Sequence, residues 1–185
     1  PLGYWKFDQG ADNTCAGGSN DACNSGSAGS ALDGAQSGMA VPATATSGWT
    51  QAGKYGKALI FDGTNDYVDM GNNAAFKPSN ITLSAWVYMP SLPGSTVVFA
   101  GKQYAVSGHG SYDLVFRTSP NRVTFTISDS TPTEYHATST NMAAATWQHW
   151  VGTYDGTPLK LYLNGVLQDT QTPGVTIAHS DTYNF

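Results

Sequence analysis

The chain has 185 residues, of which only 11% are charged, and its formal net charge is −5. This length is enough for one domain with a buried core. The charge provides no basic surface for nucleic acid or an anionic membrane, and no apolar run approaches the roughly 20 residues that a membrane span requires. We therefore expect neither nucleic-acid binding nor membrane insertion.

The composition indicates an all-β fold. Twelve of the thirteen acidic residues are Asp, and Glu134 is the single Glu. Gly, Ser, Thr, Asn, Tyr and Val are abundant, and these residues are typical of strands and turns rather than of helices.

The pattern along the chain is a sequence of short strands. Residues 3–8 alternate and predict a first strand, whereas residues 9–56 are almost wholly small and polar and predict a long loop-rich segment on the surface. Beyond them, short strand patterns bounded by Gly, Pro, Asn, Asp or Ser favour a β-sandwich or barrel. These patterns are KALIFD, DYVDM, NITLSAWVY, STVVFAG, SYDLVFR, RVTFTIS, EYHAT, WQHWVGTY, PLKLYLN and VLQDT.

Two cysteines lie within the loop-rich segment. Cys15 and Cys23 have no His nearby, so they make a poor zinc site, and a disulfide is favoured over free thiols. A disulfide fits an extracellular or cell-surface protein. Residues 1–8 lack the features of a signal peptide, so either a leader has been removed or the chain is a piece of a longer one.

One strand, residues 81–88, divides clearly into two faces. The members of the apolar face are Ile81, Leu83, Ala85 and Val87, and those of the other are Thr82, Ser84, Trp86 and Tyr88. The apolar face predicts the core side. The other face is either a ligand platform or an outer surface packed under loops, and for Trp86 we favour packing.

The best-defined local element lies near the C-terminus. The dipeptides Asp155-Gly156 and Asn164-Gly165 are suited to tight hairpin turns, and apolar residues alternate between them. Three consecutive antiparallel strands are predicted here.

Several motifs in order carry a resemblance. YWKFDQG, GKYGKALIFDGTNDYVDMGN, ITLSAWVY and WQHWVGTYDGTPLKLYLNGVL resemble the LamG-like (concanavalin A-like lectin/glucanase) jelly-roll superfamily over residues 3–169. The resemblance implies that residues 1–185 form a single domain, an antiparallel jelly-roll β-sandwich of two sheets. It also suggests a bacterial source.

The C-terminal residues depart from the pattern of this family. Its closing strand, of the kind G-x-I-D-E-V-R-I-Y, has no counterpart in residues 180–185. The first strand would then keep an open edge, which a neighbouring protein subunit or the rest of a longer polypeptide would complete.

The sequence does not favour catalysis. Glycoside hydrolases of this fold use paired carboxylates, and their E-x-D-x-x-E strand has no counterpart here because Glu134 has no second Glu as a partner. There is no G-x-S-x-G motif, and the four histidines lack metal-ligand spacing. His149, in a W-x-H run that resembles one of the family, is expected to be structural.

An acidic stretch, FDGTNDYVDMGN at residues 61–72, is the best candidate for a metal loop. Its spacing is not that of an EF-hand, and for Asp66 a hairpin turn alone is favoured. The resemblance implies a structural calcium on the sandwich rim, with Asp8 and Asp62 as donors.

A sugar site needs aromatic platforms and a few convergent polar groups. The resemblance implies a ligand on the rim loops or on a sheet face, although each candidate on its own is more often ordinary surface. The candidates are Tyr104, His109, Tyr112, Asp113, Arg117, Glu134 and His136.

Three functions remain, in order of preference. The first is a non-catalytic extracellular module that binds glycan or another extracellular surface, with a structural calcium. The second is an adhesive or structural assembly module of a cell-surface or fibre protein that contacts protein neighbours. An atypical glycoside hydrolase is the third.

Overall fold

The structure, a computed structural model, describes residues 1–16, 21–103, 110–180 and 182–185. The chain divides into two compact units. The first comprises Pro1–Ala75 with Asn184, and the second comprises Phe76–Tyr183 with Phe185. No helix in the described part of the chain is long and apolar enough to cross a membrane.

The first unit consists mainly of loops with short strands. Strand β1 pairs antiparallel with β4, and β2 pairs antiparallel with β3. A 3-10 helix η2 (Ala74–Phe76) follows β4. The preceding elements are η1 (Gly29–Leu32), β1 (Ala35–Ser37), β2 (Gly48–Thr50), β3 (Ala58–Ile60) and β4 (Tyr67–Asp69).

The strand expected at residues 3–8 does not form. Among the described residues, its ladder contact is limited to an isolated bridge between Trp5 and Asn24. Phe7 has a φ of 54°, in the left-handed region, which interrupts the extended run. The side chains of residues 3–8 alternate in exposure, as the pattern predicts. The backbone, however, is not extended over enough residues to form a paired strand.

Aspartates and one disulfide hold the loops of the first unit. Cys15 and Cys23 form the disulfide that the sequence favoured. The two carboxylate oxygens of Asp21 accept hydrogen bonds from the backbone N–H groups of Asn13 (2.6 Å) and Gln36 (2.8 Å). These charge-assisted bonds satisfy one backbone N–H group of a loop and one of strand β1.

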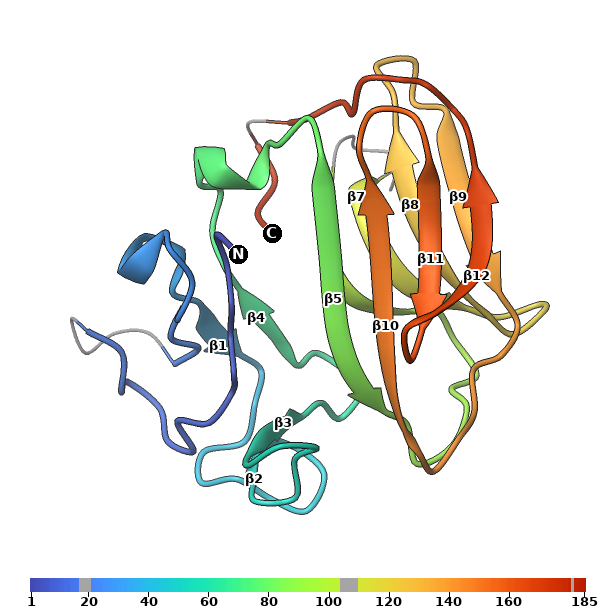
Figure 1. The fold of residues 1–185 in the computed structure, drawn as a ribbon. Coiled ribbons are helices and arrows are strands. Elements are labelled where there is room, and N and C mark those ends of the chain that lie inside the picture. Colours follow the sequence, from blue (N-terminus) through green and yellow to red (C-terminus); the bar gives the residue numbers. More distant parts are fainter. Residues whose placement is uncertain (17–20, 104–109, 181) are drawn as a thin grey trace. The chain divides into compact units, whose positions relative to one another are not determined.

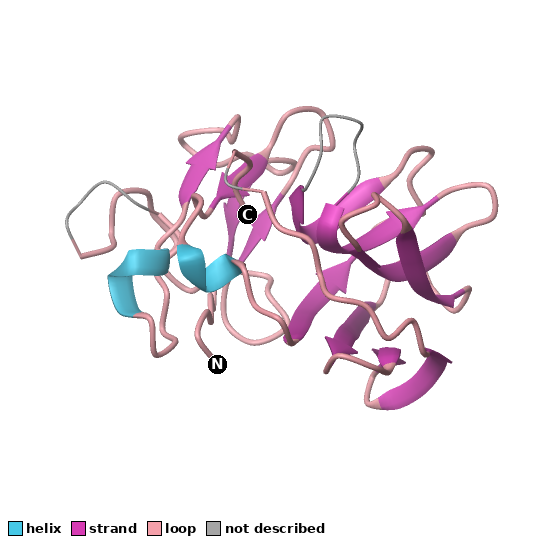
Figure 2. Cartoon of the chain, turned by 90° about the horizontal axis from the view of Figure 1, so that it is seen from above, coloured by secondary structure: helices cyan, strands magenta, loops and turns pink. Residues whose placement is uncertain are grey.

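The second unit is the β-sandwich that the sequence predicts, built from two four-stranded antiparallel sheets (Figures 1 and 2). One sheet has the order β12-β11-β10-β5 and the other has the order β6-β7-β8-β9. The strands are β5 (Ile81–Tyr88), β6 (Val97–Gln103), β7 (Gly110–Arg117), β8 (Arg122–Ser128), β9 (Glu134–Ser139), β10 (Trp147–Tyr154), β11 (Leu159–Leu163) and β12 (Val166–Gln171).

The core lies between these two sheets. Leu83 is buried there, and the other apolar members of β5 pack against the same cluster, as predicted. Gly152 on β10 allows the sheets to approach closely, because a Cβ there would lie 2.2 Å from Cγ of Phe125. The buried members of the cluster are Leu83, Met89, Tyr112, Leu114, Phe116, Val123, Phe125, Ile127, Ala137, Met142, Trp150, Tyr154, Leu159, Leu161 and Ile177.

The three consecutive strands predicted near the C-terminus are confirmed as β10, β11 and β12. They pair antiparallel in chain order. Gly156 has a φ of 101°, and Asn164 and Gly165 have φ values of 49° and 81°. Residues of both turns therefore have the positive φ values that tight hairpin turns require.

Side chains of β12 reach the edge strand β9 of the opposite sheet. Oδ2 of Asp169 accepts a hydrogen bond from the Thr138 N–H (2.8 Å). Oε1 of Gln168 accepts two further bonds, from the Ser139 hydroxyl (3.1 Å) and from the Asn141 side chain (2.6 Å). These bonds link the two sheets along one side of the sandwich.

Candidate functional site

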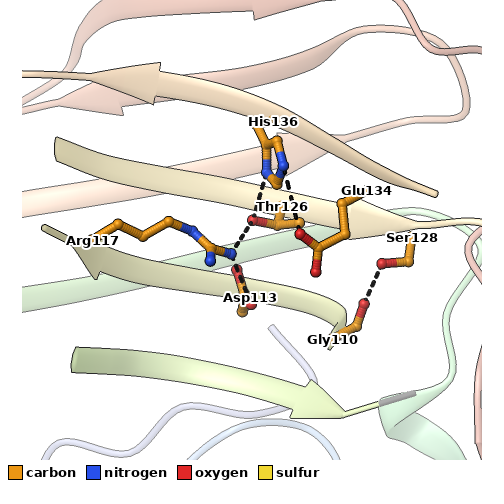
Figure 3. Close-up of polar contacts among 7 residues, drawn as sticks. All are labelled: Gly110, Asp113, Arg117, Thr126, Ser128, Glu134 and His136. Atoms are coloured by element: carbon orange, nitrogen blue, oxygen red, sulfur yellow. Dashed lines mark hydrogen bonds and ion pairs between the residues drawn. The ribbon is translucent and has the colours of Figure 1, made fainter. Parts of the chain in front are cut away.

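A row of polar side chains crosses β7, β8 and β9 on the face that points away from the core (Figure 3). Asp113 lies opposite Thr126, and Thr126 lies opposite His136. Alternate residues of these strands are core members such as Leu114 and Phe125. Because side chains alternate along a strand, the intervening polar residues share the other face. We call Asp113, Arg117, Thr126, Glu134 and His136 the polar row.

The polar row is connected from one end to the other. Nη2 of Arg117 lies 3.8 Å from Oδ2 of Asp113 and donates a hydrogen bond to Oγ1 of Thr126 (3.5 Å). Oγ1 of Thr126 lies 3.2 Å from Nδ1 of His136, and Nε2 of that ring lies 3.6 Å from Oε2 of Glu134. The dashed lines of Figure 3 follow these contacts.

Burial dominates the electrostatics of the polar row. It raises the pKa of Asp113 to about 6, and the nearby Glu134 charge adds to the rise, while hydrogen bonding to Thr126 and the charge of Arg117 oppose it. Burial also lowers the pKa of His136, although its side chain is still 40% exposed and that of Asp113 is 14% exposed. At neutral pH the imidazole is therefore neutral and can both donate and accept a hydrogen bond.

Three buried polar atoms on this face have no hydrogen-bond partner within the described residues. They are Oδ1 of Asp113, Nε of Arg117 and Oγ1 of Thr124. Thr124 lies opposite Val115 and Thr138, next to the polar row. Buried polar atoms are usually paired, so this concentration of incomplete bonding marks the face as unusual.

The polar row offers hydrogen bonds rather than a nucleophile. Thr126 and His136 have the hydroxyl–imidazole arrangement of a nucleophile and its base. The Thr126 side chain is fully buried, however, so a substrate carbon cannot reach its hydroxyl in this arrangement. The exposed ends of the row belong to Arg117, Glu134 and His136, which supply donors and acceptors.

The structure brings together four of the seven ligand residues suggested by the sequence, namely Asp113, Arg117, Glu134 and His136. Tyr112 does not lie with them, contrary to the sequence interpretation, because it is buried in the core. Its hydroxyl donates a hydrogen bond to the Phe76 carbonyl (2.9 Å), and burial raises the pKa of this hydroxyl. Its parity along β7 is opposite to that of Asp113, so it cannot share the face. Tyr104 and His109 lie outside the described residues.

Sequence reasoning missed Thr126, which joins the two halves of the polar row. A signal for it was present in RVTFTIS, where Thr124, Thr126 and Ser128 alternate with apolar residues. The hydroxyl of Ser128 donates to the Gly110 carbonyl (2.6 Å), so it ties β8 to β7 at the end of the same face.

The residues suggested for calcium accept backbone hydrogen bonds in this structure, Asp62 within a turn and Asp8 from a loop distant in the sequence. Oδ1 of Asp8 accepts a hydrogen bond from the Lys57 N–H (3.0 Å), and Oδ1 of Asp62 accepts one from the Thr64 N–H (2.7 Å). Among the described residues, no three His, Cys, Asp or Glu side chains gather in a way that could hold a metal ion.

Within the acidic stretch, residues 62–66 are not a hairpin turn, contrary to the sequence interpretation. The strands on either side of these residues, β3 and β4, pair with β2 and β1 rather than with each other. Asp66 instead links two loops, because its Oδ2 accepts hydrogen bonds from the Ser47 hydroxyl (2.7 Å) and the Asp62 N–H (2.9 Å).

Comparisons with known proteins agree with this fold. Residues 62–185 match the family described as the concanavalin A-like lectin/glucanases superfamily. Domain 4 of AbnA, a GH43 extracellular arabinanase from Geobacillus stearothermophilus, solved in complex with arabinotriose, superposes with a TM-score of 0.57. The two are 18% identical, and the match covers 83% of this chain and 71% of that one, which shows a shared fold. No curated protein sequence matches the chain.

Proposed function

Because the chain belongs to the concanavalin A-like lectin/glucanases superfamily, we propose that it is a non-catalytic carbohydrate-binding module that contacts glycan through the polar row. The observation that carries the proposal is the convergence of hydrogen-bond donors and acceptors on one sheet face, where the side chains of Arg117, Glu134 and His136 remain partly accessible. Sugar hydroxyls both donate and accept hydrogen bonds, so they match such a face.

The solved relative supports the choice of ligand class. Its structure holds arabinotriose, a short neutral oligosaccharide. The polar row combines two carboxyl groups, a guanidinium and an imidazole, so it does not present a single sign of charge. A neutral oligosaccharide needs no ionic partner, and we propose that ligand class for the row.

An extracellular setting is part of the same proposal. The Cys15–Cys23 disulfide supports it, because disulfides persist in oxidising compartments. Calcium remains a separate prediction of the sequence. Titration of Ca²⁺ into chelator-treated protein, followed by calorimetry, tests it directly, and saturable heat that disappears in Asp62→Ala would support it.

Calorimetric titration with arabinotriose and a panel of neutral oligosaccharides tests the proposed function. Arg117→Ala should weaken binding about 10-fold or more, because a hydrogen bond to a charged group contributes roughly 1.5–3 kcal/mol. His136→Ala should weaken binding about 2- to 10-fold, because a hydrogen bond to a neutral group contributes roughly 0.5–1.5 kcal/mol. Lys6→Ala is the matched control, since it removes an exposed positive charge from the first unit.

Unchanged affinity in both variants would contradict the assignment to the polar row. Absence of binding to every oligosaccharide of the panel would contradict the function itself and favour a module that contacts protein neighbours.

A further inference from the structure

A second cluster lies on the outer face of the other sheet of the sandwich. It consists of Trp86 and Tyr88 from β5 with Trp147 and His149 from β10. In the register of the two strands, Trp86 lies opposite His149 and Tyr88 lies opposite Trp147. Side chains of directly opposed residues share one face, so the four rings form two neighbouring rungs. We call these four residues the aromatic ladder.

The rings of the aromatic ladder are held in place. The Trp86 and His149 rings stack with centroids 4.9 Å apart at 17°, and the Tyr88 and Trp147 rings lie 5.6 Å apart at 49°. Nε2 of His149 lies 2.7 Å from the Ser84 hydroxyl, which fixes the orientation of the imidazole. A surface whose rings are already ordered loses little conformational entropy when it binds.

The aromatic ladder is exposed, contrary to the packing that the sequence favoured for Trp86. The exposed fractions of Trp86 and Tyr88 are 39% and 43%. Large aromatic rings are buried in most proteins, so two adjacent exposed ones indicate a surface that makes contacts.

The surroundings of the aromatic ladder are neutral and rich in hydroxyls. Lys160 is the only charged side chain among the described residues that β5, β10 and β11 place on this face, and Val151 is the only aliphatic one. The remaining members of the face, assigned from the strand register, are Thr82, Ser84, Thr153 and Tyr162.

We infer that the aromatic ladder is a second glycan-contact surface, which takes neutral polysaccharide chains. Sugar rings present apolar C–H faces beside hydroxyl edges, and this face presents aromatic rings beside hydroxyl groups. An anionic polymer would find a single cation on these three strands. Aliphatic side chains on this face are Val151 and, on the neighbouring strand β12, the half-exposed Leu167 opposite Tyr162, so a protein partner would find little aliphatic surface beside the rings. The inference rests on the proposed function only in that both surfaces take glycan, because no residue is shared.

The position of the aromatic ladder has a consequence for ligand length. The polar row and the ladder lie on the outer faces of two sheets whose core lies between them. Packed sheets are about 10 Å apart, so a trisaccharide on one face does not reach the other. A long chain, or two chains, can engage both faces at once, and avidity then favours polysaccharide over oligosaccharide.

Affinity electrophoresis in gels that contain arabinan, arabinoxylan or mixed-linkage β-glucan tests the inference. The double variant Trp86→Ala/Tyr88→Ala should be retarded at least 10-fold less than the parent protein by at least one of these polymers. Its calorimetric affinity for the oligosaccharide that the polar row binds should stay unchanged. Val166→Ala is the matched control, because Val166 is exposed on β12 of the same sheet but lies outside the ladder.

Different results would distinguish the two proposals. If Arg117→Ala loses oligosaccharide binding while the double variant keeps full polysaccharide binding, the ladder inference fails and the proposed function stands. If the parent protein binds none of the three polymers, the ladder inference also fails. If the parent self-associates in sedimentation velocity and the double variant does not, the ladder is instead an interface between copies of the chain, which overturns the inference.

Discussion

The two units of the chain are stabilised in different ways. Among the described residues of the first unit, the buried apolar side chains are those of Cys15, Ala22, Leu32 and Met70, and its loops are held by the disulfide and by carboxylates that accept backbone hydrogen bonds. The second unit instead has a continuous core between two sheets. Polar side-chain bonding can therefore order a loop-rich segment where apolar burial is scarce, at the cost of depending on a few specific residues.

Aspartate shows this contrast most clearly. Asp21 in the first unit satisfies two backbone N–H groups with its carboxylate. Asp113 in the second unit is buried with one oxygen lacking a partner, and burial raises its pKa to about 6. We therefore expect removal of the charge to destabilise the first unit and stabilise the second.

The largest expected effect comes from the core of the second unit. Phe125→Ala should lower the free energy of unfolding of this unit by about 4 kcal/mol, because it removes a fully buried ring and leaves a cavity. Hydrogen exchange followed by mass spectrometry should show faster exchange in strands β5 to β12. A similar loss of protection throughout the first unit would show that the two units unfold together, which would break the comparison.

Asp113→Asn should stabilise the second unit at neutral pH. The folded-state pKa lies above the unfolded value of 3.8, so between pH 3.8 and about 6 the folded chain holds more protons, and stability falls as pH rises. Above pH 6 the variant should exceed the parent by roughly 3 kcal/mol, and near pH 3.8 the difference should vanish. Urea unfolding of both proteins from pH 4 to 7 measures this gap, and a constant gap would refute the cause assigned.

Removal of the disulfide should affect the first unit. The bond closes a short loop with a sequence separation of 8, and in the chain-entropy relation such a loop contributes about 2.5 kcal/mol. The double variant Cys15→Ser/Cys23→Ser should therefore show amide exchange tens of times faster in the first unit. Exchange in the sandwich strands serves as the internal control and should not change.

Asp21→Ala should cost the first unit about 2 kcal/mol, because two backbone N–H groups lose their charged acceptor. Asp21→Asn keeps one acceptor oxygen and should cost roughly half as much. Thermal unfolding of the two variants gives the order, and an alanine variant as stable as the parent would show that the loops do not depend on this carboxylate.

The sandwich could be predicted from the sequence because several of its strands, among them β5 and β8, alternate between apolar and polar residues. The patterns at NITLSAWVY and RVTFTIS lie within one residue of β5 and β8. The first unit could not be read in the same way. The positive φ of Phe7 has no signal in the neighbouring residues. Strands β3 and β4 pair with strands distant in the sequence rather than with each other.

The candidate site was predictable in part. Asp113 and His136 fall in one row because the register of β7, β8 and β9 aligns them, which strand patterns alone do not specify. Tyr112 could have been rejected from the sequence, since neighbouring residues of a strand point to opposite faces. The exposure of Trp86 was not predictable, because it depends on which loops cover the outer face.

The carboxylate of Asp169 on the edge of β9 has a consequence for solubility. Its Oδ2 accepts a hydrogen bond from the Thr138 N–H. On an edge strand, such an N–H group could otherwise pair with an extended segment of another chain. A second copy of the chain would have to displace this carboxylate before it could pair with β9 at Thr138. The side-chain bond therefore makes intermolecular pairing at this position less favourable.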